Sequence, residues 1–180
     1  MSDIIVQKFG GTSVGSIDRI DAVAEIIKNV SKSQRIIVVV SAMAGETNKL
    51  VNLAKHFGNN PDKREFDALV STGETVSSAL LTMALHSKGI KAKSYSASQI
   101  SMKTTSTYSK AKILDIDADK IMDVVKQDIV PIITGFQGIT ETGDITTLGR
   151  GGSDTTAVAI AAQVKAKRCD IYTDVDGIFT

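Results

Sequence analysis

The sequence predicts an α/β fold with a parallel sheet, and three observations support this. Residues 4–6 and 35–40 are continuous β-branched runs without alternation, as in strands covered on both faces. Between them, apolar residues recur at helical spacing behind Ser16, a good N-cap residue. A crossover through a helix joins parallel strands, so the first forty residues predict a parallel strand pair.

The same alternation continues along the chain. Helical patterns occupy four further segments, which are residues 48–56, 63–87, 120–127 and 155–166. Strands are predicted at residues 92–95, 129–134 and 169–173, and a β-hairpin with a four-residue turn at residues 139–146. The Ser- and Thr-rich residues 96–108 are predicted as loop with one helical turn. We find no repeat and no linker, which predicts one domain over residues 1–180.

The amino-acid composition excludes several classes of function. The chain has 21 Lys and Arg against 20 Asp and Glu, and only 4% aromatic residues. It therefore lacks the positive electrostatic field and the aromatic side chains for base stacking that are typical of nucleic-acid-binding proteins. Cys169 is the only cysteine, so no internal disulfide forms. The N-terminus has no signal-peptide or membrane-span pattern. We therefore expect a cytoplasmic protein that binds neither nucleic acid nor membrane.

Three glycine-containing turns follow predicted strands. Residues 8–13, 41–48 and 147–154 each lead from a strand toward a helix, where close backbone approach and free N–H groups form anion sites. Lys8 precedes its glycines, so this is not a Walker A loop. For one such turn, a tight turn beside a solvated lysine is the simpler interpretation. Three of them favour a ligand site at the carboxyl ends of parallel strands.

Five segments in order resemble one family. They are residues 8–14 (KFGGTSV), 41–48 (SAMAGETN), 71–74 (STGE), 149–154 (GRGGSD) and 173–177 (TDVDG), and together they are similar to aspartate kinases of the amino-acid-kinase family. The resemblance implies a three-layer αβα sandwich with a mainly parallel central sheet. It also implies ATP-dependent phosphorylation of the L-aspartate side-chain carboxylate to 4-phospho-L-aspartate, the first step of the lysine, threonine and methionine branch, with ATP and Mg²⁺.

Phosphoryl transfer to a carboxylate brings two anions together, so positive charge and positioning carry the catalysis. Lys8 suits this task, and the N–H groups of Gly10 and Gly11 with the Ser41 hydroxyl would add donors. Asp154 would hold Lys8 or help to bind Mg²⁺, and a helix cap alone is the alternative. The resemblance implies that Asp154 organises the lysines of the transfer site.

Aspartate carries two carboxylates and an ammonium. Arg150 is the natural clamp for the α-carboxylate, Glu74 is the natural partner of the ammonium, and Thr47 adds a hydroxyl. Glu74 follows Gly73 within a helical pattern, which indicates a helix interruption or a close backbone approach. Without the resemblance, an exposed glutamate is the simpler interpretation. Further substrate-binding residues implied by the resemblance are Ser41, Gly151, Gly152 and Ser153.

The nucleotide site is also assigned by resemblance. Its residues are Lys8, Phe9, Gly10, Gly11, Thr173, Asp174 and Phe179. Residues 174–177 superficially resemble a calcium loop, but the full register is absent, so we expect no resident metal site.

The resemblance covers the N-terminal part of a kinase domain. We expect the aspartate-binding half and the start of the nucleotide-binding half, truncated at its C-terminal end and without regulatory domains. A non-catalytic fragment that binds aspartate, or only packs against a partner, is the alternative. Residues 171–173 are expected to form an internal strand. A chain that ends soon after them leaves an apolar sheet edge, which predicts a homo-oligomer.

Overall fold

A computed structural model describes residues 4–58 and 60–173. Its elements are, in chain order, β1 (Ile4–Phe9), α1 (Ile17–Val30), β2 (Arg35–Val40), α2 (Glu46–Lys55), α3 (Lys63–Val70), α4 (Thr72–Ser87), β3 (Ala92–Tyr95), β4 (Lys103–Thr104), β5 (Ile113–Asp115), α5 (Ala118–Lys126), β6 (Val130–Thr134), β7 (Gln137–Ile139), β8 (Ile145–Thr147), α6 (Gly152–Gln163) and β9 (Arg168–Tyr172). Ser16 caps α1 as predicted, because its side chain accepts from the Arg19 N–H.

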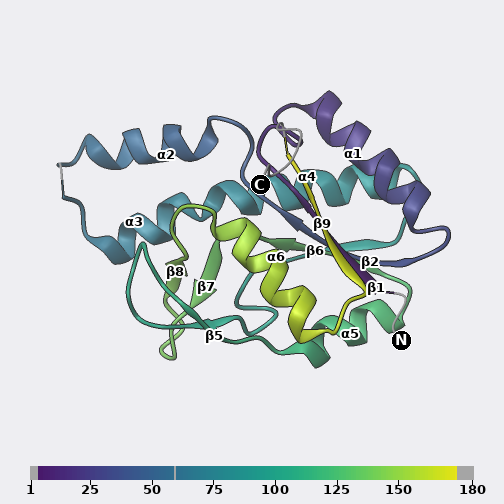
Figure 1. The fold of residues 1–180 in the computed structure, drawn as a ribbon. Helices are drawn as coiled ribbons and strands as arrows, with labels where there is room; N and C mark the ends of the chain where they lie inside the picture. Colours follow the sequence, from purple (N-terminus) through teal and green to yellow (C-terminus); the bar gives the residue numbers. More distant parts are fainter. Residues whose placement is uncertain (1–3, 59, 174–180) are drawn as a thin grey trace, which may run out of the picture.

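The main sheet has five strands in the order β3-β6-β2-β1-β9, and every pair is parallel. Phe9, the last residue of β1, pairs with Val40 on one side and Tyr172 on the other. The strands therefore end together at one edge of the sheet (Figure 1). In the described part of the chain β9 lies at the border of this sheet, not inside it as expected.

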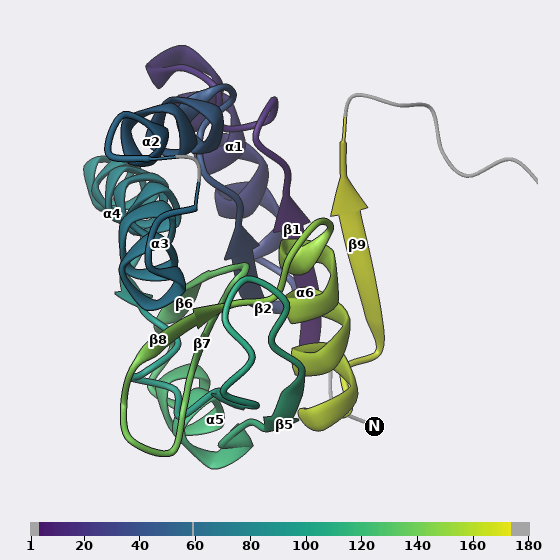
Figure 2. The ribbon, with the colours of Figure 1, turned by 90° about the vertical axis from the view of Figure 1, so that its left-hand side faces the viewer.

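Helices cover both faces of the main sheet (Figure 2). On one face, Ile5, Phe9 and Val38 pack with buried side chains of α1 and α4. On the other face, Val6 and Val39 pack with side chains of α5 and α6. Burying both faces requires the unbroken apolar strands seen in the sequence. The predicted α/β class with a mainly parallel sheet between helices is confirmed.

A second, four-stranded sheet has the order β5-β4-β7-β8. It contains the predicted hairpin, in which Gly138 of β7 pairs with Thr146 of β8 in antiparallel register. The prediction of loop over residues 96–108 was incomplete, because β4 lies within it, and β5 was not predicted. Strands of two and three residues are too short to show an alternating pattern.

The helical pattern predicted over residues 63–87 is confirmed, but it is divided at Ser71 into α3 and α4, two residues before the interruption that Gly73 indicated. Ser71 itself keeps helical backbone angles, so the junction is not made by a change in its backbone conformation. Its carbonyl accepts a 2.7 Å hydrogen bond from Gln137 Nε2 instead. By length and composition residues Lys63–Ser87 could cross a membrane, but half of the apolar window is buried within the fold, as in core helices generally.

Gly73 allows α4 to approach the turn after β2 closely, as its position within a helical pattern indicated. A Cβ at Gly73 would lie 2.8 Å from the Cβ of Ala42, on the turn after β2. Only glycine therefore lets the start of α4 touch that turn. This contact brings the next residue, Glu74, to the carboxyl end of the sheet.

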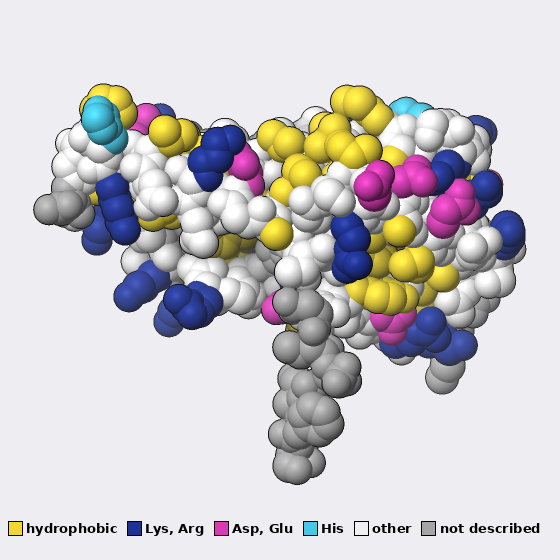
Figure 3. All heavy atoms as spheres, turned by 90° about the horizontal axis from the view of Figure 1, so that it is seen from above, with side chains coloured by type: hydrophobic (Ala, Val, Ile, Leu, Met, Phe, Trp, Pro, Cys, Tyr) yellow, Lys and Arg dark blue, Asp and Glu magenta, His cyan; other side chains and the backbone are white. Residues whose placement is uncertain are grey.

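Large apolar side chains are also exposed on the helices that face away from the second sheet. They include Ile17 of α1 and Val76 and Met83 of α4. Seen from above, apolar groups alternate with charged ones on this face (Figure 3).

Candidate active site

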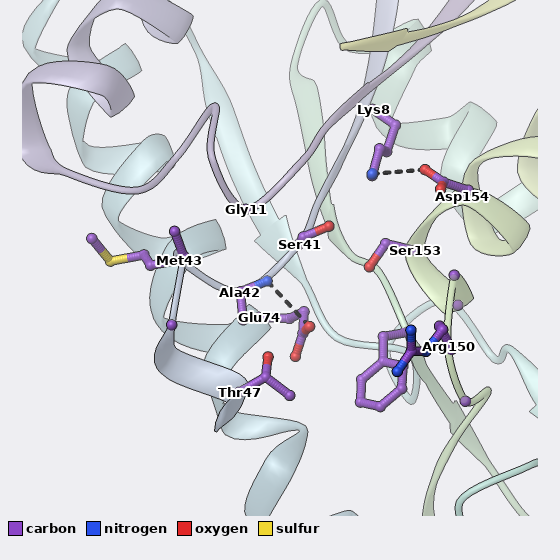
Figure 4. Close-up of a pocket in the computed structure, with 16 residues that line it drawn as sticks. Lys8, Gly11, Ser41, Ala42, Met43, Thr47, Glu74, Arg150, Ser153 and Asp154 are labelled. Atoms are coloured by element: carbon purple, nitrogen blue, oxygen red, sulfur yellow. Dashed lines mark hydrogen bonds and ion pairs between the residues drawn. The ribbon is translucent and has the colours of Figure 1, made fainter. Parts of the chain in front are cut away.

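A cavity of about 330 Å³ lies at the carboxyl ends of β1 and β2. The three glycine-containing turns predicted from the sequence meet there, and they contribute Gly11, residues 41–45 and residues 149–151 to its lining. Glu74 of α4 and Phe136 complete the wall (Figure 4). The structure thus brings together the predicted residues Lys8, Gly11, Ser41, Thr47, Glu74, Arg150, Gly151, Gly152, Ser153 and Asp154.

Two helices begin at this cavity behind left-handed glycines. Gly45 precedes α2 with φ +82°, and Gly151 precedes α6 with φ +74°, and neither makes a side-chain cap hydrogen bond. Ser153 and Asp154 lie in the first turn of α6, whose N-cap residue is Gly151, so the alternative of Asp154 as the helix cap was wrong. Helix N-termini present N–H groups and a partial positive charge, so this arrangement favours anionic ligands.

Lys8 and Asp154 form an ion pair at one end of the cavity. Lys8 Nζ lies 2.7 Å from Asp154 Oδ1, with 9% of the Lys8 side chain and 47% of the Asp154 side chain exposed. Lys8 reaches from β1 toward the first turn of α6, and Figure 4 shows the pair at the cavity wall. The carboxylate fixes the ammonium in place while leaving it beside the space that a ligand would fill.

Glu74 is a buried carboxylate at the other end. It is 4% exposed, and its Oε1 accepts the Ala42 N–H at 3.1 Å. Its Oε2 is buried and has no hydrogen-bond partner. Burial raises the pKa of Glu74 from 4.5 to about 7, and the bond from Ala42 opposes that rise. An unpaired buried carboxylate oxygen is costly, and a cationic ligand group would satisfy it.

Arg150 follows β8 on a turn shaped by Gly149, whose φ is +82°. Its side chain is exposed, and Figure 4 shows it on the opposite side of the cavity from Glu74. A guanidinium at this position offers a two-pronged donor set to a carboxylate.

Phe136 lines the cavity but was missed from the sequence. Its φ is +67°, unusual for a residue with a side chain, and its N–H donates to Thr156 Oγ1 of α6 at 3.1 Å. A Cβ at Gly152 would lie 2.8 Å from Phe136 Cδ2, so the ring packs directly on that glycine. The Gly135–Phe136 pair directly after a buried strand was the available signal.

Several residues predicted for the nucleotide site do not line this cavity. Phe9 is fully buried and stacks on Tyr172, with ring centroids 4.6 Å apart, so its side chain belongs to the core. The Gly10 N–H donates to the Tyr172 carbonyl at 3.1 Å, so it is not the free donor expected. Thr173 is exposed after β9. Asp174 and Phe179 lie outside the described residues.

Comparison with known proteins defines the class. The model of the amino acid kinase family matches residues 3–180, nearly the whole chain. The chain therefore belongs to the amino acid kinase family.

The proteins similar to this chain include aspartokinases. The aspartokinase of Geobacillus stearothermophilus is 58% identical over 98% of this chain and 44% of its own length. The structure of aspartate kinase from Synechocystis matches with a TM-score of 0.82 at 47% identity, over 97% of this chain and 29% of that one. E. coli aspartokinase III in complex with aspartate and ADP has a TM-score of 0.88 at 29% identity, over 97% of this chain and 50% of that one. The chain thus spans under half the length of the curated relatives it matches.

Proposed function

We propose that this chain forms the aspartate-binding and phosphoryl-transfer region of an ATP-dependent aspartate kinase. One observation carries the proposal, the unpartnered, buried Glu74 Oε2 facing Arg150 across a cavity lined by two helix N-termini. An α-amino acid supplies the ammonium that Glu74 lacks and a carboxylate for Arg150. The aspartate kinases among the relatives support the choice of amino acid.

In this proposal the amino acid is held at both of its charged α-substituents. Glu74 Oε2 accepts the ammonium, and the Arg150 guanidinium grips the α-carboxylate. Thr47 and Ser41 would add hydroxyls, and the N–H groups of Gly151 and Ser153 offer further donors. The Gly152 N–H already donates to the Gly149 carbonyl at 3.0 Å, so Gly152 would contribute close backbone approach. Fixing these groups aims the side-chain carboxylate at the remaining end of the cavity, where Lys8 lies.

The transfer step needs positive charge beside the phosphoryl group. A side-chain carboxylate oxygen of aspartate forms a bond to the γ-phosphorus of ATP, and the bond to ADP breaks. Lys8 would stabilise the charge on the phosphoryl oxygens during that exchange, and Asp154 would keep its ammonium aligned. Gly11 and the start of α6 would supply neutral N–H donors from the opposite walls.

We place the phosphates of MgATP at the Lys8 end of the cavity in this proposal. Among the described residues no group of three or more His, Cys, Asp or Glu could hold a metal ion. Mg²⁺ that arrives on phosphates keeps several waters and needs only one or two carboxylates, and Asp154 is the half-exposed carboxylate at the right place. Lys8, Gly11 and Thr173, with Asp174 and Phe179, remain our proposed nucleotide contacts.

Calorimetry on the 180-residue chain tests substrate recognition directly. We expect L-aspartate to bind and succinate, which lacks the ammonium, to bind more weakly than aspartate. Equal affinity for the two would remove the proposed role of Glu74. For the transfer step, this chain would replace the matching segment of the Geobacillus stearothermophilus aspartokinase, and the chimera would be assayed for aspartate-dependent ADP release.

A chain that binds aspartate without transferring phosphate is the second candidate. The observation in its favour is that the aspartate-holding residues Thr47, Glu74 and Arg150 all line one cavity, whereas Thr173 lies outside it. Aspartate binding by the 180-residue chain without ADP release, together with an active chimera, would assign recognition to this segment and transfer to the complete enzyme.

Three broader proposals follow from the aspartate kinase assignment. The product, 4-phospho-L-aspartate, would feed lysine, threonine and methionine synthesis in the cytoplasm. The exposed Val76 and Met83 of α4 support a homo-oligomer, because such side chains are commonly covered at interfaces. Sedimentation of the chain as given measures its association.

A further inference from the structure

A buried carboxylate outside the cavity connects two of its walls. Asp67 of α3 is fully buried and accepts four hydrogen bonds from neutral donors. Its Oδ2 accepts the N–H groups of Ser109 and Thr147, both at 2.8 Å. Its Oδ1 accepts their hydroxyls at 2.9 Å and 3.0 Å. A carboxylate is the side chain that can accept all four at once.

The first partner, Ser109, has an unfavourable backbone conformation. Its φ is +65°, in the left-handed region that side-chain-bearing residues rarely adopt. Two of the Asp67 hydrogen bonds hold it there. As a result the Ser109 carbonyl oxygen lies 3.2 Å from the place a Cβ would take on Gly149. Ser109 thus packs against the residue that precedes Arg150.

The second partner, Thr147, ends β8 three residues before Arg150. Its N–H and hydroxyl are held by Asp67, and its carbonyl accepts the Ala111 N–H at 2.9 Å. The main chain entering the Arg150 turn is therefore fixed on both sides. Asp67 holds the turn twice, once through β8 and once through Ser109.

The helix that carries Asp67 also leads to the other wall of the cavity. After α3, only Ser71 separates it from α4, and Glu74 lies in the first turn of α4. Gln137 Nε2 fixes the junction through the Ser71 carbonyl. Asp67 is therefore placed to set the separation between Glu74 and Arg150.

We propose that Asp67 is a positioning residue of the substrate site, which holds the Arg150 turn at the distance from Glu74 that one amino acid spans. The ligand named here rests on the proposed function, whereas the positioning of the turn does not. Asp67 touches neither substrate nor reacting atoms, since its hydrogen bonds go to Ser109 and Thr147.

The side-chain chemistry offers a conservative variant. In Asp67→Asn the amide oxygen can accept both N–H groups while the amide nitrogen donates to the two hydroxyls, which rotate to accept. Asp67→Ala leaves two N–H groups buried without an acceptor. We therefore expect asparagine to rescue what alanine loses.

Arg64 gives a matched control on the same helix. Its Nε lies 2.7 Å from Asp144 Oδ1, at the start of the same hairpin strand, and Tyr108 also donates to Asp144 at 3.2 Å. Arg64 thus tethers the same two segments from outside, but half of its side chain is exposed. Exposed ion pairs contribute little, so Arg64→Ala should leave the site unchanged.

Calorimetry with L-aspartate on the 180-residue chain tests the proposal. Asp67→Ala should raise the Kd about tenfold or more, whereas Asp67→Asn and Arg64→Ala should stay within about threefold. In an Arg150→Ala background, Asp67→Ala should add no further loss, because it acts through Arg150. A folded Asp67→Ala chain with the parent's Kd, or full additivity with Arg150→Ala, would overturn the proposal.

Amide hydrogen exchange supplies a readout that needs no ligand. Exchange of residues 148–152 should accelerate in Asp67→Ala while the strands of the main sheet keep their protection. If the parent chain does not bind aspartate, the proposed function fails, and this exchange still decides the role of Asp67. If Asp67→Ala does not fold, Thr147→Val removes one hydroxyl bond at constant volume. It should then accelerate exchange in the same segment, and unchanged exchange would overturn the proposal.

Discussion

The two ends of the cavity are built differently. At the Glu74 end, the carboxylate is almost completely buried, one oxygen is held by a backbone N–H, and the facing Arg150 turn is fixed through Asp67. At the Lys8 end, two opposite charges meet directly, and nearly half of the Asp154 side chain is exposed. The first end is a desolvated carboxylate without a charged partner, whereas the second is an ion pair whose carboxylate is half-exposed.

This contrast separates two tasks. A desolvated, pre-positioned carboxylate selects ligands, because a molecule without a matching ammonium leaves it unpaired. An ammonium already paired with a half-exposed carboxylate selects little, but it stabilises negative charge that develops beside it. We expect substitutions at the Glu74 end to change affinity for aspartate and those at the Lys8 end to change turnover.

The largest effect is expected for Lys8→Met. In the chimera it should lower kcat by about a hundredfold or more, because removing one electrostatic contact to the transition state costs that much. The apparent affinity for aspartate should change by less than about threefold. Lys28→Met, on the outer surface of α1, is the matched control. Equal kcat in the Lys8→Met chimera and its parent would contradict the division of tasks.

Glu74→Gln should weaken aspartate binding by roughly tenfold to a hundredfold, because a charge-assisted hydrogen bond contributes about 1.5–3 kcal/mol. Glutamine keeps an acceptor for the Ala42 N–H, so folding should be preserved. Succinate lacks the ammonium and should bind parent and variant alike. Calorimetry with both ligands measures the difference, and a parallel loss for succinate would mean that Glu74 shapes the pocket without contacting the ammonium.

Arg150→Lys should weaken aspartate binding by about tenfold, since an ammonium cannot reproduce the two-pronged contact of a guanidinium. The same substitution at Arg168, which pairs with Asp170 on exposed β9, should change affinity by less than about twofold. An unchanged Kd in Arg150→Lys would place the α-carboxylate elsewhere.

The last expected effect is a pH dependence that belongs to the Glu74 end. The Glu74 pKa is raised to about 7 in the free protein. The ammonium of aspartate pairs with the ionised carboxylate, so below pH 7 Glu74 must lose a proton before aspartate binds. Aspartate affinity should fall by up to about tenfold per pH unit between pH 7 and pH 5. Stability of the free chain should change oppositely. Protonated Glu74 is favoured in the folded state, so its contribution is full below pH 4.5 and is lost as pH rises through 7.

Glu74→Gln provides the reference for both pH trends. The difference between parent and variant isolates this one group from all others that titrate. Melting temperatures and Kd values measured from pH 5 to pH 8 give the two profiles. Parallel profiles for parent and variant would show that the Glu74 carboxyl does not titrate in this range.

Much of the fold was predictable because buried parallel strands leave an unbroken apolar pattern. β1, β2 and β3 follow from such runs or from their place between helices, and Ser16 marks the start of α1 by its own hydrogen bond. Gly73 indicated an interruption, but its position at Ser71 was not predictable, because Ser71 retains helical backbone angles and is fixed by a glutamine far along the chain. Junctions made by tertiary contacts leave no local signal.

The residues of the site also fall into those that the sequence predicts and those that it does not. Lys8, Glu74 and Arg150 carry chemistry that a sequence reveals, and the structure places all three at one cavity. Phe136 was missed because its place at the cavity depends on a left-handed backbone conformation, which a phenylalanine in the sequence does not indicate. Asp67 was missed because its partners, Ser109 and Thr147, lie about 40 and 80 residues away.

The pairing of β1 with β9 also has a consequence for folding. β1 is the first described element to be synthesised. Of its two neighbours in the sheet, β2 is synthesised soon afterwards and β9 is the last described strand. Lys8 lies on β1 and Asp154 on α6, so almost the whole described chain must be made before their ion pair closes. Contacts between residues so distant in the chain form slowly. We therefore expect both ends of the cavity to be completed late in folding, because Arg150 and Asp154 both lie near the end of the described chain.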